Sequence, residues 1–276
     1  MKLWRAHGLG NDYLVAESGP ALTPSLARRI CDRHTGVGSD GVLEPADPGT
    51  QDYGVRIWNP DGSTAEKSGN GLRIFARWLE QEQNAGTQFS VWTGSEAVQC
   101  DVGPEQITIE MGQARLKPAE VPVLADGPVI HERWTVGPDA VHLTVVGMGN
   151  PHAVVLVDPN QDLDALPWRR WGAAIESDPR FPNRTNVQVC RCLPQGGLEI
   201  RIWERGAGPT QASGSSACAS TVAAVVNHRL KPGRHAVHMP GGTLFVTVDP
   251  ELQVRLEGPV QAVGRIEVDP AWLAAG

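Results

Sequence analysis

Apolar and polar residues alternate over short stretches along the whole chain, a pattern typical of strands with one buried face. Together with the turn residues between them, these stretches predict strands at 14–15, 53–58, 89–92, 97–101 and 107–111 in the first half. The same pattern predicts strands at 140–146, 153–157, 186–189, 198–203, 236–239, 243–248 and 253–256 in the second half. The chain is therefore expected to be rich in short strands joined by turns.

Three other stretches have helical periodicity. Residues 24–33 follow Thr23, a favoured N-cap, and place Pro24 at the first helical position. Residues 71–83 carry apolar side chains at spacings of three and four. Residues 217–227 are small and apolar all round, which predicts a helix buried on every side.

One module occurs twice in the chain. Arg56-Ile57-Trp58 reappears as Arg201-Ile202-Trp203, and Ser68-Gly69 reappears as Ser213-Gly214, so both pairs differ by 145 positions. Gly8-Leu9-Gly10-Asn11 is echoed by Gly147-Met148-Gly149-Asn150 at an offset of 139. A unit of this length is far longer than a solenoid repeat, so the sequence indicates a duplicated domain.

Prolines mark the expected boundary between two domains. Pro118, Pro122 and Pro128 crowd a stretch without periodicity that begins near residue 115. The 276 residues suffice for two domains of ordinary size, each with its own core. We expect both domains to mix helices and strands, with short strands wrapped around a central helix.

Composition argues against several classes of protein. The net charge of −7 argues against non-specific electrostatic binding to nucleic acid or acidic lipid. No run approaches the roughly 18 apolar residues that span a bilayer, and the first residues do not resemble a signal peptide. The cysteines are odd in number, scattered and without zinc spacing, which indicates reduced thiols in a cytoplasmic protein without a metal site: Cys31, Cys100, Cys190, Cys192 and Cys218.

The two Ser-Gly pairs share one setting. Each follows a strand that ends in Trp and a turn that contains Gly, and each leads directly into a predicted helix. Ser68 and Ser213 would then cap helices whose first free N–H groups attract a carboxylate or phosphate. Capping alone would explain either pair taken singly, since Ser is a common N-cap. Their recurrence at one offset favours a paired anion site.

Six motifs, in this order along the chain, closely resemble the diaminopimelate epimerase family: His7-Gly-Leu-Gly-Asn-Asp12, Arg33-His-Thr-Gly-Val-Gly-Ser-Asp-Gly41, Arg56-Ile-Trp-Asn-Pro-Asp-Gly62, Ser68-Gly-Asn-Gly71, Gly149-Asn-Pro-His152 and Glu204-Arg-Gly-Ala-Gly208. The resemblance runs from the first residues to about Ser220. It implies an α+β fold of two pseudo-symmetric domains, residues 1–117 and 118–262. Each would be a mostly antiparallel, barrel-like sheet wrapped around a central helix, and a C-terminal strand within 263–276 would return to the first domain.

The resemblance also implies a reaction. In this family two similar domains close on the substrate, and a cysteine from each domain removes or delivers the proton at the α-carbon, without pyridoxal or metal. The chain would interconvert LL- and meso-diaminopimelate for lysine and peptidoglycan precursor synthesis. Its partner would be a small molecule, diaminopimelate or a similar amino acid, with no nucleic acid and no membrane. Family likeness also suggests a cytoplasmic homodimer.

The site residues follow by matching motifs. His152 would lie behind the reacting groups, and Glu204 would act in catalysis as well as in binding. The polar and glycine residues that would hold the substrate are Asn11, Asn59, Gly69, Asn70, Asn150, Asn186, Glu204, Arg205, Gly214 and Ser215.

Ser68 and Ser213 stand where the family has its two catalytic cysteines. A thiol has a pKa near ~8.5 that a helix N-terminus can lower, whereas a serine hydroxyl is far less acidic and needs an adjacent base. His152 is a candidate base for one serine, and the sequence offers no equivalent for the other. General acid–base assistance contributes roughly 10²–10⁴-fold, so an epimerase without both thiols is expected to be slower by several orders of magnitude.

Two origins of the serines and three functions stay open. The serines are engineered replacements or natural divergence, and the unusual neighbours Lys67, Pro209 and Ser215-Ser216 favour divergence. The chain is then an impaired or altered amino-acid epimerase or racemase, or a non-catalytic protein that keeps the pocket to bind or sense an amino acid. An isomerase with Glu66 or Glu204 as a single carboxylate base is the third alternative.

Overall fold

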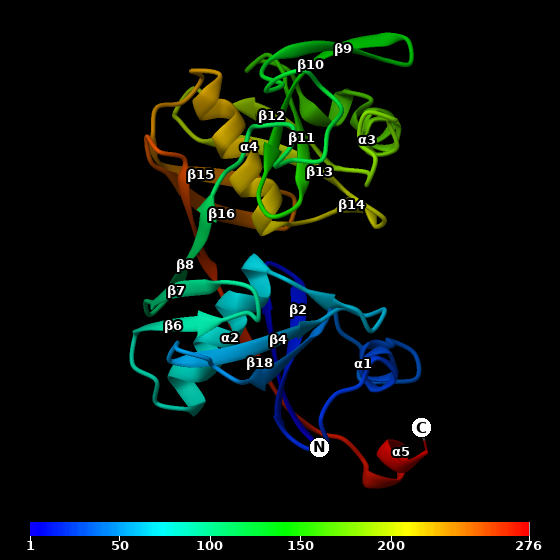
Figure 1. Cartoon of the computed structure of the whole chain (residues 1–276), viewed down its shortest axis with the longest axis vertical. Helices are drawn as coiled ribbons and strands as arrows, with labels where there is room; N and C mark the ends of the chain where they lie inside the picture. Colours follow the sequence, from blue (N-terminus) through cyan, green and yellow to red (C-terminus); the bar gives the residue numbers. More distant parts are fainter. Residues whose placement is uncertain (276) are drawn as a thin grey trace. The chain divides into compact units, whose positions relative to one another are not determined.

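Two compact units make up the part of the chain that the computed structural model describes, residues 1–275. Unit 1 comprises Met1–Glu110 and Glu257–Gly276, and unit 2 comprises Met111–Leu256. The chain passes from unit 1 into unit 2 within β8 (Gln106–Gln113) and returns within β17 (Gln253–Pro259), as Figure 1 shows. The C-terminal segment therefore belongs to the same unit as the N-terminal strand.

Unit 1 is built on a mostly antiparallel sheet. Besides β8, its strands are β1 (Lys2–Gly8), β2 (Asn11–Ser18), β3 (Val42–Ala46), β4 (Tyr53–Trp58), β5 (Thr64–Ala65), β6 (Gln88–Trp92), β7 (Ala97–Val102) and β18 (Gln261–Glu267). Antiparallel ladders join β18 to β1, β1 to β2, β3 to β4, β4 to β5, β6 to β7 and β7 to β8. Parallel ladders join β2 to β3 and β4 to β6.

Helix α2 (Gly69–Glu82) is enclosed in unit 1, and residues 69–79 are all buried. It packs against β1, β2 and β7 (Figure 1). Its sequence shows an apolar stripe, yet the polar flank is buried as well, since Arg73 is 1% and Arg77 is 7% exposed. Arg73 donates to the Gly69 carbonyl at 3.1 Å and Arg77 to the Gly103 carbonyl at 2.7 Å. These backbone acceptors allow a helix with two arginines to be covered on every side.

Helix α1 (Pro24–Cys31) begins as the sequence predicts. Thr23 Oγ1 accepts a hydrogen bond from the Leu26 N–H at 3.2 Å, and Pro24 occupies the first turn. The helix ends two residues before the predicted position 33, because Asp32 takes an extended conformation. The Asp32 carboxylate then accepts the His34 N–H at 2.8 Å and so orders the turn that follows.

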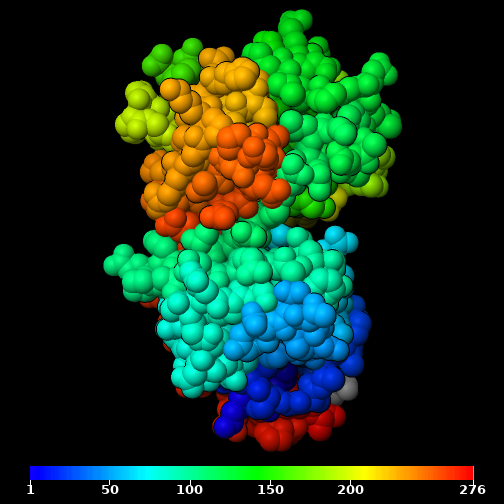
Figure 2. Space-filling model, turned by 60° about the vertical axis from the view of Figure 1, so that its left-hand side comes forward, coloured from blue at the N-terminus to red at the C-terminus, as the bar shows by residue number. Residues whose placement is uncertain are grey.

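The C-terminal residues pack against the N-terminal strand of unit 1. The Val268 N–H donates to the Met1 carbonyl at 2.9 Å, directly after the β18 to β1 ladder. A short helix, α5 (Pro270–Ala274), follows, and the Arg29 guanidinium lies 4.3 Å from the centroid of the Trp272 ring. In Figure 2 these red residues border the dark blue N-terminal ones at the surface.

Unit 2 has a sheet of the same kind. Besides β17, its strands are β9 (Glu132–Val136), β10 (Asp139–Gly147), β11 (Pro151–Leu156), β12 (Asn186–Cys192), β13 (Leu198–Glu204), β14 (Gly208–Thr210), β15 (Gly233–Met239) and β16 (Gly242–Val248). Antiparallel ladders join β9 to β10, β10 to β11, β12 to β13, β13 to β14 and β15 to β16. Parallel ladders join β11 to β12 and β13 to β15.

Helix α4 (Gly214–Val226) is the enclosed helix of unit 2. Residues 216–225 are all buried, and the helix packs against β10, β11, β12, β13, β15 and β16 (Figure 1). The prediction of a helix buried on every side is confirmed. Two further helical segments, the 3₁₀ turn η1 (Leu163–Ala165) and α3 (Trp168–Glu176), contribute buried side chains to the core of this unit.

The two units repeat one topology. An offset of 145 carries α1 to 169–176 and α2 to 214–227, which are close to the observed bounds of α3 and α4. The parallel ladders agree in register, since Leu14 is opposite Val42 in unit 1 and Ala153 is opposite Val187 in unit 2. The duplication inferred from the sequence is therefore confirmed strand by strand, and the α+β fold class is confirmed with it.

Sequence periodicity missed the strands β1, β3, β5, β9, β14 and β18, the 3₁₀ turn η1 and the helices α3 and α5. Nearly every residue of β18 is exposed, so the strand has no buried face to produce an alternation and is held by backbone pairing with β1. The helix α3 does carry a signal, because Trp168, Trp171 and Ile175 lie at spacings of three and four. The offset of 145 from the predicted first helix also indicates it.

Candidate active site

The N-terminus of α2 carries the first predicted catalytic position. Ser68 is the N-cap, and its Oγ accepts a hydrogen bond from the Gly71 N–H at 3.0 Å. The Tyr13 hydroxyl lies 3.1 Å from the same Oγ. Gly69 and Asn70 supply the first N–H groups of the helix, where the dipole is positive. Ser68 therefore lies where an anion is stabilised, with a second hydroxyl beside it.

Asn70 and Asn11, two predicted substrate contacts, are brought together here. Asn70 Nδ2 donates to the backbone carbonyl of Asn11 at 2.8 Å and to Asn11 Oδ1 at 2.7 Å. Asn11 Nδ2 donates in turn to Asp40 Oδ2 at 2.7 Å, and the same oxygen accepts the Asp12 N–H at 3.1 Å. The turn between β1 and β2 is thus fastened to the first turn of α2.

Charged side chains hold this network in place. Arg33 Nη2 lies 2.7 Å from both Asp12 Oδ1 and Asp40 Oδ1, and Arg5 Nη2 lies 2.6 Å from Asp12 Oδ2. Hydrogen bonds to Asp12 and Asp40 raise the pKa of Arg33 above its ordinary value. Asp12 is 7% exposed, so its buried carboxylate is compensated by two guanidinium groups. Asp40 therefore orders the turn through Asn11, Asp12 and Arg33.

The packing around Asn70 is tight. Arg73 Nη2 donates to Asn70 Oδ1 at 3.1 Å, which fixes the carboxamide from the helix side. From the strand side, a Cβ at Gly8 would lie 1.9 Å from the same Oδ1. Glycine at position 8 is therefore required by the close approach of Asn70 to β1.

Asn59 lies in the turn between β4 and β5. Its N–H donates to the Ser63 carbonyl at 2.8 Å, and its Nδ2 donates to Ser63 Oγ at 2.9 Å. Asp61 Oδ1 accepts the Ser63 hydroxyl at 2.6 Å and the Ser63 N–H at 2.9 Å, and these two bonds lower the pKa of Asp61. In the structure the Asn59 side chain orders its own turn, and it takes no part in the network of Asn11 and Asn70.

The N-terminus of α4 carries the second predicted catalytic position, Ser213. This residue is also an N-cap in extended geometry, but its side chain makes no capping hydrogen bond. Gly214 and Ser215 follow in the first turn, and both are partly exposed. Ser216, the counterpart of Gly71 at the offset of 145, is completely buried and its Oγ accepts a hydrogen bond from Gln188 Nε2 at 2.9 Å.

His152 lies on β11 and is completely buried. Its Nε2 donates to Asn150 Oδ1 at 2.8 Å. Burial lowers the pKa of His152 from 6.5 to about 3; the neighbouring Gln188 side chain, which favours the protonated ring, opposes this shift, and the charge of Arg205 adds to it. At neutral pH the ring is therefore uncharged and a weak base, and its bond to Asn150 fixes the orientation of that carboxamide.

Asn186, Glu204 and Arg205 meet at the end of β13. Asn186 Nδ2 donates to the Pro151 carbonyl at 3.0 Å, and its Oδ1 accepts the Arg205 N–H at 3.0 Å. Glu204 is the last residue of β13 and is partly buried, and Arg205 extends to the Asn183 carbonyl at 3.1 Å. Asn186 thereby joins the turn after β10 to the turn after β13.

Glu176, which the sequence analysis did not single out, fixes that second turn. It is 5% exposed and lies at the end of α3. Its Oε1 accepts the Gly206 N–H at 2.7 Å, and its Oε2 accepts the Trp203 indole N–H at 2.6 Å. Arg184 pairs with the same carboxylate at 2.5 Å.

Each unit thus gathers its own share of the predicted residues. Unit 1 joins Ser68, Asn70 and Asn11, while unit 2 joins Asn150 to His152 and Asn186 to Arg205. Sequence reasoning missed Tyr13, Gln188 and Glu176. For Tyr13 a signal existed: the offset of 139 that pairs Asn11 with Asn150 also pairs Tyr13 with His152.

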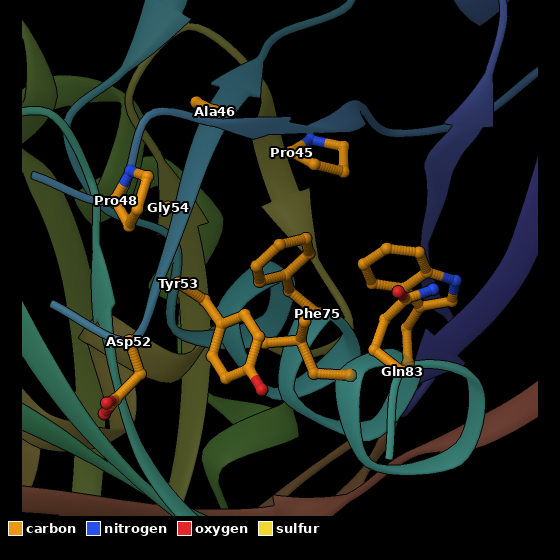
Figure 3. A pocket seen from close by; sticks show the side chains of 10 residues that line it. Pro45, Ala46, Pro48, Asp52, Tyr53, Gly54, Phe75 and Gln83 are labelled. Carbon is orange, nitrogen blue, oxygen red and sulfur yellow. The ribbon is translucent and has the colours of Figure 1, made fainter. Parts of the chain in front are cut away.

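A cavity of about 200 Å³ in unit 1 contains none of the predicted site residues. Phe75, Trp78 and Leu79 from the later turns of α2 line it together with Pro45 and Tyr53 of the β3 to β4 hairpin. Figure 3 labels Phe75, Pro45 and Tyr53 among the lining side chains. Phe75 and Trp78 stack with ring centroids 5.4 Å apart. Ser68 lies at the opposite end of the same helix, so this apolar cavity is separate from the candidate site.

The native thiols lie in surroundings that suppress reactivity. Burial raises the pKa of Cys100 to about 12, and it also raises the pKa values of Cys31, Cys190 and Cys192. Cys218 is completely buried in α4. Residues 1–275 contain no group of three His, Cys, Asp or Glu placed to hold a metal ion. None of the helices in that range is both long and apolar enough to cross a membrane.

The fold is shared with solved structures of epimerases and related proteins. A hydroxyproline epimerase from Agrobacterium vitis matches with a TM-score of 0.69 and 17% identity, over 98% of this chain and 94% of that chain. A protein of the PhzF family from Bacillus anthracis matches with a TM-score of 0.71 and 16% identity, over 98% and 99% of the two chains. At such identities the likeness defines the class of fold.

Sequence comparison defines the family within this class. The family model for diaminopimelate epimerase matches residues 3–117 and 144–263. A diaminopimelate epimerase from Desulfitobacterium hafniense is 39% identical over 277 residues, covering 95% of this chain and 96% of the relative. Another from Desulforudis audaxviator is 37% identical over 286 residues, covering 100% of both. The chain belongs to the diaminopimelate epimerase family, as its motifs predicted.

Proposed function

We propose that this protein epimerises diaminopimelate at the α-carbon, with Ser68 and Ser213 in the two proton-transfer positions. The observation that carries the proposal is the pair of equivalent helix N-termini, each beginning at a serine N-cap and followed by Gly. Such a terminus stabilises a carboxylate through its free N–H groups and its dipole. Membership of the family supports diaminopimelate as the substrate. It also supports a role for both helix N-termini in the same epimerisation reaction.

The proposed roles follow from the local chemistry. Gly69-Asn70 and Gly214-Ser215 offer backbone N–H groups to the α-carboxylate. Asn11, Asn150 and Asn186 present carboxamides that recognise amino and carboxylate groups of the substrate, as do Asn59, Glu204 and Arg205. His152 is uncharged at neutral pH, and we assign it the orientation of Asn150.

Serine makes the proposed reaction slow. A hydroxyl is far less acidic than a thiol, so less alkoxide is present to remove the α-proton. General acid–base assistance is worth roughly 10²–10⁴-fold, which sets the scale of the expected loss. We further propose that the reaction needs no pyridoxal phosphate, and that the protein is a cytoplasmic homodimer, as the family resemblance suggests.

Solvent exchange tests the proposal. The purified protein and its Ser68→Cys/Ser213→Cys variant are incubated with LL-diaminopimelate in deuterated buffer, and loss of the α-proton signal is followed by NMR. The double variant is expected to exchange about 10²–10⁴-fold faster than the unmodified chain. Each single Cys variant is the matched control and should gain much less, since both faces of the α-carbon need a proton-transfer group. A double variant that neither binds nor exchanges diaminopimelate contradicts the proposal.

A second function is favoured by the same two serines. A protein that retains the carboxamides and helix N-termini but lacks both thiols is suited to bind an amino acid without turning it over. Ligand-induced thermal stabilisation of the unmodified chain, with no exchange by that chain or by the double Cys variant, supports this binding or sensing function. Exchange by the double variant supports an epimerase site.

A further inference from the structure

Tyr13 contacts the proton-transfer position of unit 1 directly. It lies on β2, two residues after Asn11, and is 7% exposed. Its hydroxyl is 3.1 Å from Ser68 Oγ, across 55 positions of sequence. The phenol therefore approaches Ser68 from the sheet, while the Gly71 N–H approaches from the helix at 3.0 Å.

The duplication places an equivalent ring in unit 2. Tyr13 precedes Leu14, which is opposite Val42, and His152 precedes Ala153, which is opposite Val187. Both rings thus occupy the same register of the strand that follows the Gly-Asn turn. Their contacts differ, because His152 bonds to Asn150 and Tyr13 reaches the N-cap hydroxyl itself.

Hydrogen-bond chemistry sets the direction of the Tyr13 contact. A serine oxygen has one proton and two lone pairs, and the Gly71 N–H uses one lone pair. A phenol, with a pKa near ~10, is a stronger acid and a better donor than an aliphatic hydroxyl. The Tyr13 O–H therefore donates to the second lone pair of Ser68 Oγ. The hydroxyl proton of Ser68 is then not used in either contact and is available to a ligand.

We infer that Tyr13 is a positioning residue that lowers the proton affinity of the group at position 68. Two donors and the positive end of the helix dipole stabilise negative charge on that atom. Ser213 makes no capping hydrogen bond, so the two serines are chemically unequal and Ser68 is the stronger acid. This inference rests on the proposed role of position 68 in proton transfer.

A thiol placed at position 68 reports the effect without any substrate. In the full-length Ser68→Cys variant, the rate of alkylation by iodoacetamide is measured against pH, and the labelled peptide is identified by mass spectrometry. Position 68 is partly exposed, whereas Cys31, Cys100, Cys190 and Cys218 are buried. Adding Tyr13→Phe removes only the phenolic oxygen and is expected to slow alkylation at pH 7 about tenfold, with the profile displaced to higher pH.

Ser213→Cys is the matched control, because Tyr13 belongs to the other helix terminus. There Tyr13→Phe should leave the alkylation profile in place. A profile at position 68 that does not move with Tyr13→Phe, or one that moves equally at position 213, overturns the inference. A merely structural role would lower the melting temperature without moving the profile, and that outcome also overturns it.

The failure of the inference and the failure of the proposed function are distinguishable. Alkylation measures the thiol whether or not the protein turns over an amino acid, whereas solvent exchange by the double Cys variant measures epimerisation. In that double variant, Tyr13→Phe should also displace the pH profile of exchange to higher pH. A displaced alkylation profile without any exchange supports the role of Tyr13 and contradicts the epimerase.

Discussion

Gln188 and Ser216 join the sheet of unit 2 to its central helix through one buried hydrogen bond of 2.9 Å. Both side chains are completely buried, and Gln188 also contacts the ring of His152. This hydrogen bond links β12 to the first turn of α4.

Removal of this hydroxyl should destabilise unit 2. Ser216→Ala leaves a buried amide without its partner, which costs about 1–3 kcal/mol of unfolding free energy. Ser220→Ala is the matched control: it is the same deletion in the same helix, and Ser220 Oγ is buried without a hydrogen-bond partner. Urea denaturation should therefore show a loss for Ser216→Ala and little change or a gain for Ser220→Ala. Equal losses would falsify the assignment.

Acid should destabilise the protein through His152. The unfolded chain binds a proton at a pKa near 6.5, while the buried ring binds one only near about 3. The folded state therefore loses stability as pH falls from 6.5 towards 3, by up to about 1.4 kcal/mol per pH unit. Between pH 7 and 5.5 the expected loss is about 1 kcal/mol.

Variants separate this contribution from other titrating groups. His152→Gln removes the imidazole and should flatten the dependence of unfolding free energy on pH between 7 and 5.5. His238→Gln removes an exposed imidazole from the same unit and is the control. An unchanged slope in His152→Gln would show that the buried ring is not the source.

A methyl group at position 8 should disturb the network at the N-terminus of α2. In Gly8→Ala the new Cβ would lie 1.9 Å from Asn70 Oδ1 and 3.1 Å from Arg73 Nη2, so both groups must move. Overpacking of this kind costs about 1–3 kcal/mol. We expect a lower melting temperature and weaker thermal stabilisation by diaminopimelate.

Gly127→Ala is the control for this substitution. Nothing in the described chain lies within 4 Å of a Cβ at position 127, and its backbone does not take a positive φ. It should leave both the melting temperature and the ligand effect close to those of the unmodified protein. Normal ligand stabilisation in Gly8→Ala would show that Asn70 is not needed for binding.

Glu176 should control the turn that carries Arg205. Glu176→Gln places an NH2 group against the Gly206 N–H or the Trp203 indole N–H, so a donor faces a donor and about 1–3 kcal/mol is lost. Arg184→Gln removes only the half-exposed ion-pair partner and should cost less than about 1 kcal/mol. Thermal denaturation of both variants checks the difference. Similar losses would assign the effect to the ion pair.

Family resemblance and geometry contribute different parts of the candidate site. Motifs located Ser68, Asn70 and Asn11 in the sequence, and the structure joins them at one helix terminus. The apolar stripe of α2 gave no sign that Arg73, on the polar flank, is buried and donates to Gly69 and Asn70. Helical periodicity predicts on which face of the helix a side chain lies. It does not predict which neighbouring elements bury that face.

The sequence by itself determined the duplication, most of the strands and the two serine-capped helices. The duplication shows as motifs that recur at offsets of 145 and 139. The strands and the helix starts depend on local spacing and on N-cap preferences, which act within a few residues. Only the tertiary structure decided the contact of Tyr13 with Ser68, that of Gln188 with Ser216 and that of Glu176 with Gly206. Their partners lie 55, 28 and 30 positions apart, and the packing of a whole sheet around its central helix brings them together. Burial in the same packing lowers the pKa of His152, which no local pattern could show.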